Sequence, residues 1–534
     1  MFADKIGHAR HLVLSGEGVL YVNTWGEHHY ESGTPHPGGF IVALKDTSGS
    51  GKADVIERFG PSAAEGGRGG TGIALYKGAV YVEEADRIER YTLAPGAIVG
   101  AGRPEVIVSG LPLSGDHPMH PFVIDADGVL YIDVASATNS CQARNRQLRS
   151  PGLNPCTELS GRGGIWRYSA SKTGQKFSPA QRYATGIRNA DGIALDGSGR
   201  GLYATQHGRD QLHENWPQLY KPQEEATQPA EELLRISEGG DYGWPECYFD
   251  WIQNKLVLAP EYGGDGGKAV GICEGKLAPV AGFPAHWAPN DLVIYTGKSF
   301  PEHYRNGAFI AFHGSWDRAP YPQGGYNLVF QGLSSGRASG RCEVFADGFA
   351  GAIKDPERAA HRPSGVAVAP DGALYVSDDV GGRIYRIVYG GGTRQSTAYT
   401  LCPPPDAPAG SPGSANAGPP EGVHANAGMS LRVAPGSSQR MVQLGDAVFH
   451  GRAGGAGCIG CHGEDGSGTN LGPDLTAASW HVSDGSYAGI RKVIEDGAPQ
   501  SKQYESPMPP MGGAQLTPEQ LSAVAAYVWA LSHH

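Results

Sequence analysis

Near the C-terminus, Cys458, Cys461 and His462 form a Cys-x-x-Cys-His motif. Two thiols at this spacing can each add to one vinyl group of a haem, and the adjacent histidine then lies under the iron as an axial ligand. A Cys-x-x-Cys pair alone also occurs in redox and zinc sites. A Gly-Pro-Asp-Leu run at 472–475 and a predicted closing helix at 518–531 favour the haem. The motif therefore predicts haem c bound through both thiols.

The second axial ligand is predicted from a proline-rich segment, Ser506–Gly512, which contains two methionines. Met508 lies in a Met-Pro-Pro-x-Gly context that resembles the sixth-ligand loop of small cytochromes c, and Met511 would then pack as an ordinary apolar residue. The sequence favours Met508 without excluding Met511. A thioether opposite an imidazole raises the haem potential, which suits an electron acceptor. The electron donor is therefore expected upstream.

The composition of the 534 residues is that of a turn-rich folded protein. Glycine (81) and proline (39) are both abundant, yet 40% of the residues are hydrophobic, which is too many for a disordered chain. The net charge of −11 comes from scattered acidic residues without any block of Lys or Arg, which argues against nucleic acid or anionic membranes as partners. No apolar run is long enough to predict a transmembrane segment.

Haem attachment through thioethers indicates an oxidising compartment, and we expect the bacterial periplasm. The first residues, Met1–Asp4, are not a signal peptide, so an export signal is expected to have been removed. Six further cysteines predict disulfides, for which fifteen pairings are possible. Pairing of sequence neighbours is the simplest prediction: Cys141 with Cys156, Cys247 with Cys273, and Cys342 with Cys402.

A degenerate repeat runs through the first 390 residues, in which a glycine turn precedes an alternating β-run with a central aromatic residue. It occurs at 18–22, 78–82, 128–132, 201–204, 307–310 and 372–376, and the longest interval contains an insertion at 248–289. Each period can hold four strands, which is typical of a β-propeller, here with six blades. Unrelated hairpins in a sandwich would give a similar pattern. Helical periodicity is limited to 223–234 and 354–360, which are expected in loops.

The composition changes at about residue 401. Residues 401–436 are rich in Pro, Gly, Ala and Ser and cannot bury a core, which predicts an extended or flexible linker. Residues 439–451 then predict the first helix of a small cytochrome. The predicted architecture is an all-β six-bladed propeller at 1–400, the linker at 401–436, and a small all-α cytochrome c domain at 437–534.

Propellers bind ligands at the mouth of the central channel, where loops from several blades converge. Candidate polar loops are Asp116-His117, Arg188-Asn189, Thr205–Leu212 and Gly240–Pro245. A histidine beside a carboxylate can act as a general base, because its pKa lies near working pH and the acid can orient the ring. His117 is one of 19 histidines, so its assignment depends on the later segments.

The order of these segments over residues 5–390 resembles the soluble pyrroloquinoline quinone (PQQ) sugar dehydrogenases, and more closely their sorbosone and pyranose dehydrogenase relatives. The resemblance implies that His117 removes the substrate hydroxyl proton, with Asp116 holding the ring, while hydride passes to the quinone. It also implies that Arg188 and Asn189 bind the quinone, and that Arg188 stabilises the charge that develops on its carbonyl. With the haem domain, the chain resembles a periplasmic quinohaemoprotein.

The same resemblance implies further cofactor contacts. Backbone carbonyl oxygens of Gly208 and Arg209 would hold a calcium ion, which prefers hard oxygen ligands. Arg362 would pair with a cofactor carboxylate, and either Trp316 or Arg318 would clamp the cofactor.

Two departures from the family pattern limit what can be carried over. The glucose dehydrogenases have a substrate-binding glutamine where this chain reads Glu65–Gly70, so Arg68 is assigned to the site instead and the exact substrate stays open. The clamp lysine of the family is missing from the 313–318 loop.

The predicted function is a PQQ-dependent dehydrogenase that oxidises a sugar, sugar aldehyde or alcohol. Electrons would pass through its own haem c to an external cytochrome, copper protein or quinone pool, and the linker would let the cytochrome dock on the propeller mouth and then turn away. The alternative is a carbohydrate-binding or scaffolding propeller fused to an electron-transfer cytochrome, without dehydrogenase activity. A calcium-dependent lactonase is a third possibility, but it would not need a covalent haem.

Overall fold

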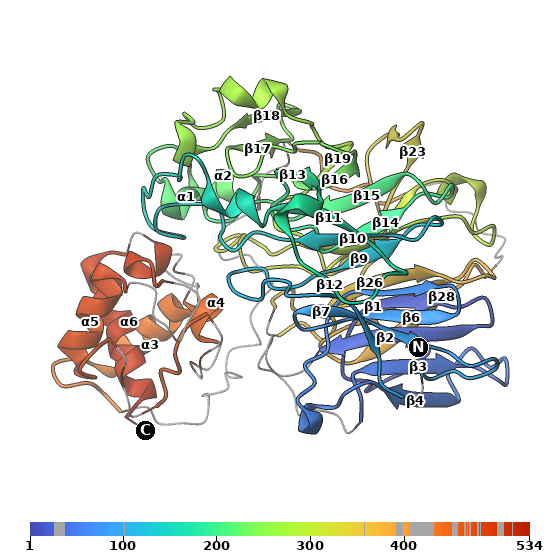
Figure 1. Cartoon of the computed structure of the whole chain (residues 1–534). Coiled ribbons are helices and arrows are strands. Elements are labelled where there is room, and N and C mark those ends of the chain that lie inside the picture. The colour runs from blue at the N-terminus through green and yellow to red at the C-terminus, as the bar shows by residue number, and fades with distance from the viewer. Residues whose placement is uncertain are drawn as a thin grey trace.

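The computed structural model describes the whole chain except residues 26–37, 101, 357, 391–398, 406, 408, 411–431, 451–455, 457, 464–465, 467, 469–470, 478–479, 481, 499–506, 515 and 534. It contains a β-propeller and a small helical domain, which confirms the predicted fold class (Figure 1). Most of the predicted linker, 411–431, lies outside the described residues, as does Ser506. The domain boundaries therefore stay predictions.

Six sheets form the blades of the propeller. The first three consist of β1 (His8–Leu14), β2 (Val19–Trp25), β3 (Ile41–Lys45) and β4 (Val55–Phe59); β5 (Ile73–Tyr76), β6 (Ala79–Glu84), β7 (Arg87–Thr92) and β8 (Glu105–Ser109), extended by β12 (Gln175–Lys176); and β9 (Phe122–Ile124), β10 (Val129–Val134), β11 (Gly164–Ser169) and β13 (Arg182–Thr185).

The other three blades complete the ring. They consist of β14 (Ile193–Leu195), β15 (Leu202–Gln206), β16 (Glu231–Ile236) and β19 (Ala281–Phe283); β20 (Pro289–Ile294), β21 (Ala308–Phe312), β22 (Asn327–Gln331) and β25 (Glu343–Ala346); and β26 (Pro363–Val368), β27 (Leu374–Asp378) and β28 (Arg383–Ile387). Each of the six sequence repeats forms the second strand of one blade: β2, β6, β10, β15, β21 or β27.

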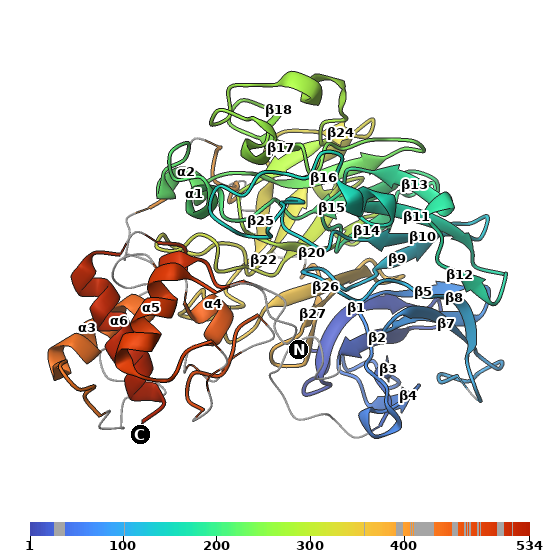
Figure 2. The same ribbon diagram turned by 60° about the vertical axis from the view of Figure 1, so that its left-hand side comes forward.

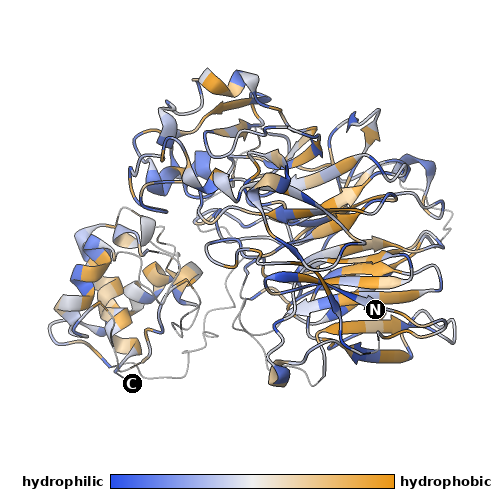
Figure 3. Ribbon diagram, viewed as in Figure 1, coloured by the Kyte–Doolittle hydropathy of each residue, from blue (hydrophilic) through white to orange (hydrophobic). Residues whose placement is uncertain are grey.

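The alternation of each repeat strand reflects burial against two neighbouring blades. In β10, Leu130 and Ile132 pack with Tyr81 of the preceding blade, whereas Tyr131 packs with the cluster that contains Leu202 of the following blade. Successive side chains of a strand point to opposite faces, so both faces of one sheet become core. Hydrophobic residues are accordingly concentrated in the strands and polar residues in the connections (Figure 3).

The N-terminal segment closes the ring. Phe2 donates a backbone hydrogen bond to the Ile384 carbonyl at 2.7 Å, and Ala3 forms a β-bridge with the same residue of β28. The Phe2 ring also meets Tyr375 edge to face at 4.9 Å. The last blade has three named strands, and this segment extends it at the edge.

Small elements lie in the connections between strands. They are the hairpins β17 (Cys247–Asp250) with β18 (Lys255–Leu258) and β23 (Leu333–Ser334) with β24 (Arg337–Ala338), the short helices α1 (Leu212–Asn215) and α2 (Pro222–Glu225), and the 3-10 helices η1 (Ala63–Glu65), η2 (Thr157–Ser160), η3 (Pro179–Gln181), η4 (Pro260–Tyr262), η5 (Gly271–Gly275) and η6 (Glu302–Tyr304).

The helix predicted at 223–234 is mostly wrong, because α2 ends at Glu225 and the leucines of β16 instead pair with β15 and β19. Tertiary pairing here overrides the local pattern. The described residues of 354–360 contain no helix either. The three predicted disulfides, in contrast, are all confirmed.

The helical domain contains α3 (Gln439–Phe449), α4 (Ile459–His462), α5 (Tyr487–Asp496), η7 (Pro510–Gly513) and α6 (Pro518–Leu531). The predicted first and closing helices are thus confirmed. Thr517 and Gln520 form a capping box at the start of α6, with Pro518 at its first position. Gly445 lets α3 pack closely against α6, because a Cβ atom at this position would lie 2.0 Å from the carbonyl oxygen of Ala523 in α6.

The helical domain lies beside the propeller, next to loops from several blades, in both views of Figures 1 and 2. Among the described helices, none has the length and apolar character that a membrane span requires.

Candidate active site at the propeller mouth

A cavity of about 270 Å³ lies where the propeller mouth meets the helical domain. Its propeller wall includes six of the predicted site residues: Asp116, His117, Arg188, Asn189, Gly208 and Trp316. Its other wall includes the predicted haem ligands and attachment residues Cys458, Cys461, His462 and Met508. The fold therefore brings two groups of candidate residues, far apart in the sequence, into one cavity.

His117 lies in the loop between β8 and β9 and is buried. Its Nδ1 atom lies 2.9 Å from the carbonyl oxygen of Ser136 and 3.1 Å from the Ser136 hydroxyl. A carbonyl oxygen can only accept, so Nδ1 carries the proton and Nε2 keeps a lone pair. Burial, together with the positive charge of Arg188, lowers the pKa of His117 well below its ordinary value. The ring is therefore a neutral base at physiological pH.

The predicted role of Asp116 in orienting this ring is wrong. Its carboxylate accepts hydrogen bonds from Arg146 Nε at 2.9 Å and from Asn145 Nδ2 at 3.2 and 3.3 Å. Ser136 orients His117 instead. Consecutive residues in a loop direct their side chains differently, so adjacency in the sequence did not predict the contact.

Arg188 lies between β13 and β14. Its side chain is buried and surrounded by hydrogen-bond acceptors. Its guanidinium donates to Asp210 Oδ2 at 2.7 Å, to the Gly208 carbonyl at 2.9 Å, and to the carbonyl and side-chain oxygens of Asn139, both at 3.0 Å. Four hydrogen bonds hold the guanidinium in one position. It therefore provides a fixed positive charge at the cavity wall.

A second arginine, which the sequence did not single out, completes an ionic network. Arg146 donates to Asp116 at 2.9 Å and to Asp210 at 2.9 Å, so two arginines and two aspartates alternate along the wall. Burial opposes ionisation of Asp210, but the charges of Arg188 and Arg146 hold its pKa well below the ordinary value. Asp210 belongs to the candidate segment 205–212, whereas no sequence pattern pointed to Arg146.

Three predicted cofactor-binding arginines do not line the cavity. Arg362 donates to the backbone carbonyls of His313 and Gly314 at 3.2 and 2.6 Å. Arg318 donates to the Pro322 carbonyl of its own loop and to two carbonyls of neighbouring loops, and Arg68 is exposed. Arg362 thus acts on the site indirectly, by supporting a loop whose His313 side chain is part of the cavity wall.

The predicted calcium site on backbone oxygens does not fit this arrangement. The Gly208 carbonyl already accepts the Arg188 guanidinium, and Arg209 is outside the cavity wall, paired with Glu261 at 2.5 Å. A cation would compete with the arginine for the same oxygen. By contrast, the Asn189 amide, which faces the cavity without a hydrogen-bond partner in the described part of the chain, is available to a ligand.

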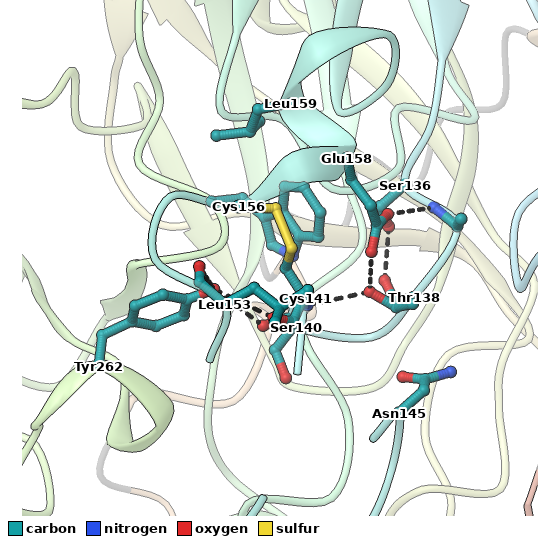
Figure 4. The surroundings of a disulfide bond; sticks show 12 residues. Ser136, Thr138, Ser140, Cys141, Asn145, Leu153, Cys156, Glu158, Leu159 and Tyr262 are labelled. Carbon is teal, nitrogen blue, oxygen red and sulfur yellow. Dashed lines mark hydrogen bonds between the residues drawn. A yellow bond between two sulfur atoms is a disulfide. The ribbon is translucent and has the colours of Figure 1, made fainter. Parts of the chain in front are cut away.

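The Cys141–Cys156 disulfide lies in the connection between β10 and β11, which also contains Ser136, Asn139 and Arg146. Figure 4 shows this bridge with Ser136 and Asn145 nearby. Within this connection, the Glu158 carboxylate accepts from the Ala137 amide and the Thr138 hydroxyl. Trp244 packs on the disulfide and donates to the Asn139 carbonyl at 3.0 Å. The Gly240–Pro245 segment thus acts through this loop, without lining the cavity itself.

Replacing Cys141 and Cys156 together with serine is expected to lower the free energy of unfolding by about 3 kcal/mol, because the bridge closes a loop of about 15 residues. Denaturant unfolding measures this loss, and hydrogen exchange is expected to rise at residues 138–146. The matched control is the double serine variant of Cys342 and Cys402, which lie outside the cavity wall. Equal exchange at 138–146 in both variants would contradict the assigned role.

The helical domain contains a second, largely apolar cavity around the Cys-x-x-Cys-His motif. His462 Nδ1 lies 2.9 Å from the Pro473 carbonyl, so Nδ1 donates and Nε2 is left for an iron atom. Cys458 and Cys461 are not joined to each other, and Met508 is part of the wall, whereas Met511 is not. These residues fit a covalently attached haem.

Comparisons with known proteins agree with this division of the chain. A family model described as TrAA12-like matches residues 62–390, and a cytochrome c model matches residues 442–532. The chain is 26% identical over 237 residues to a pyrroloquinoline quinone-dependent pyranose dehydrogenase of Coprinopsis cinerea, covering 38% of this chain and 30% of that protein. It is 28% identical over 211 residues to an uncharacterized protein of Borreliella burgdorferi, covering 39% and 48%. The chain thus spans less than half the length of these curated relatives.

Two solved structures share the propeller fold. An AA12-family carbohydrate-active enzyme of Trichoderma reesei superposes with a TM-score of 0.55 at 18% identity, covering 72% of this chain and 94% of that chain. The PQQ domain of C. cinerea pyranose dehydrogenase, in its holo form, superposes with a TM-score of 0.54 at 17% identity, with the same coverage.

Proposed function

Because the chain belongs to the TrAA12-like family and carries a cytochrome c domain, we propose that it is a PQQ-dependent sugar dehydrogenase that reduces its own haem c. The observation that supports this best is the shared cavity. His117 and Arg188 line one wall, and Cys458, Cys461 and His462 line the other. A cofactor bound at the propeller mouth would therefore lie beside the haem domain.

The residues of the mouth fit a planar, polar cofactor. Trp316 presents an aromatic side chain to the cavity, Asn189 offers an amide that has no partner among the described residues, and Arg188 supplies a fixed positive charge. PQQ, when bound, accepts a hydride from the substrate carbon and returns the electrons one at a time. Arg188 stabilises negative charge that develops at the mouth, because its guanidinium is already oriented before the reaction.

His117 removes the proton from the substrate hydroxyl. The Ser136 carbonyl fixes its tautomer, so Nε2 is the basic nitrogen. Burial of the ring and the charge of Arg188 keep it uncharged, so that it can accept a proton. Asp116 takes no part in this proton transfer, because its carboxylate pairs with Arg146. We assign to Asp116 the role of holding the Arg146 side chain in the cavity wall.

In the helical domain, His462 would bind the haem iron through Nε2, and Met508 would be the second protein ligand of the iron.

We also propose that the chain acts in an extracytoplasmic space, since it combines three disulfides with a haem c motif. Pro509 and Gly512 form part of the mouth wall, so a substrate bound beside His117 would also lie beside the helical domain.

The test uses the full-length protein with haem attached, loaded with PQQ and supplied with a panel of pyranose sugars, other aldoses, aldehydes and alcohols. We expect the absorbance of reduced haem to rise only when both PQQ and a substrate are present. A binding or scaffolding propeller would bind sugar and leave the haem oxidised. Oxidised haem with every compound, in protein that has bound PQQ, would overturn the proposal.

A further inference from the structure

We propose that the propeller mouth binds a divalent transition-metal ion through Asp210, His286 and Asp317. One carboxylate oxygen of each aspartate and one ring nitrogen of His286 all lie within 4.8 Å of one another. Ligands at about 2.0–2.2 Å from one ion lie up to about 4 Å apart, so small side-chain movements would complete the site. The three residues come from connections after β15, after β19 and after β21, which meet at the mouth.

His286 has the hydrogen-bond arrangement of a metal ligand. Its Nε2 atom lies 2.9 Å from the Glu225 carbonyl, so Nε2 carries the proton and Nδ1 keeps the lone pair. Metal-bound histidines typically donate their second nitrogen to a backbone carbonyl in this way, which fixes the tautomer and the ring plane. The ring is 3% exposed and forms part of the cavity wall.

Asp317 provides the second observation that points to a ligand. The residue is 8% exposed, its Oδ1 atom is buried without a hydrogen-bond donor among the described residues, and its carboxyl group faces that of Asp210. An unpaired carboxylate oxygen away from water costs free energy. A cation at the mouth would remove this cost, because the oxygen lies within ligand distance of Asp210 and His286.

The surrounding charges favour a cation. Among the described residues, the cavity wall carries six carboxylates but only two guanidinium groups, those of Arg146 and Arg188. Both arginines bind the same oxygen of Asp210, Oδ2, so its other oxygen is free of them. A dication would favour the ionised forms of these carboxyl groups, because burial raises the pKa of Asp191 to about 6 and the pKa of Glu231 to about 7.

The ligand set selects the class of ion. Two carboxylates and one imidazole suit zinc or manganese, whereas calcium and magnesium prefer oxygen ligands alone. The site therefore differs in ligands and in chemistry from the backbone calcium site that the family resemblance implied. It does not depend on the proposed oxidation, because metal binding can be measured without PQQ or sugar.

The test is calorimetric titration of the full-length, chelator-treated haem protein with Zn²⁺, with Mn²⁺ and with Ca²⁺, together with elemental analysis. We expect one site per chain at the mouth, and we expect Asp317→Asn to weaken binding at least 10-fold. The matched control is Asp127→Asn, an exposed aspartate outside the cavity wall, which should bind like the parent. His286→Asn provides the same test if Asp317→Asn does not fold.

Three outcomes would overturn the inference: no binding of either ion by the parent, parental affinity in folded Asp317→Asn and His286→Asn, or stoichiometric binding of Ca²⁺ alone. Because PQQ and sugar are absent from the titration, its failure is distinguishable from failure of the proposed dehydrogenase function.

Discussion

Replacing His117 with glutamine is expected to lower the rate of sugar-dependent haem reduction by about 10²–10⁴-fold, the usual contribution of a general base. Glutamine retains a hydrogen-bonding group near Ser136, but it has no nitrogen that takes up a proton at neutral pH. Initial rates of haem reduction with saturating PQQ measure the effect. The spectrum of the oxidised haem is expected to stay unchanged, because His117 belongs to the propeller.

The matched control is His303→Gln, because His303 pairs with Glu343 outside the cavity wall. It should react at the parental rate. A His117→Gln variant that binds PQQ and reduces haem within a few-fold of the parent would contradict the assignment of His117 as the base.

The assignment of His117 as the base also predicts how the rate of proton transfer depends on pH. Burial and Arg188 lower the pKa of His117, with a smaller contribution from Arg146 in the same direction, and the Ser136 carbonyl and Asp210 only partly oppose them. A lowered pKa keeps the neutral base populated as the pH falls through 6.5. The rate of the proton-transfer step should therefore show no loss centred at pH 6.5, and a loss there in the parent would count against His117.

The fold could be predicted because its pattern repeats. A blade strand such as β10 is buried on both faces, so every blade needs the same glycine turn, apolar alternation and central aromatic residue. The closing helix of the cytochrome domain was predicted to its ends, since Thr517 and Pro518 mark its start. Two of the disulfides join cysteines 15 and 26 residues apart, within single connections, whereas Cys342–Cys402 spans 60 residues and the whole last blade.

The site was predictable only in part, because residue type does not determine the direction of a side chain. Arg362 and Arg318 have the chemistry to bind carboxylates, but in the fold their guanidinium groups bind backbone carbonyls. Adjacent residues also diverge: Asp210 faces the cavity while Arg209 pairs with Glu261 away from it. Ser136, which follows β10, meets His117 from the connection before β9, and no pattern in the sequence records this contact.

Replacing Met508 with alanine is expected to lower the haem reduction potential by on the order of 100 mV or more, because a thioether ligand raises it and axial ligands largely set it. Met508 lies in the wall of the haem cavity together with His462. Backbone hydrogen bonds of 2.9 Å in both directions with Ala498 hold this methionine in place. Met511 is in η7, outside both cavity walls, so Met511→Ala should leave the potential unchanged.

A spectroscopic redox titration of both variants measures the potentials, and an equal fall in both, or a fall only in Met511→Ala, would contradict the assignment of Met508.

The effects of the His117 and Met508 substitutions can also be distinguished from each other in one experiment. A lowered potential makes the haem a poorer acceptor but leaves the base at the mouth intact. A small dye that accepts electrons directly at the propeller should therefore restore sugar oxidation in Met508→Ala and should not restore it in His117→Gln. If the dye restored neither variant, Met508 would be needed for a step other than electron transfer to the haem.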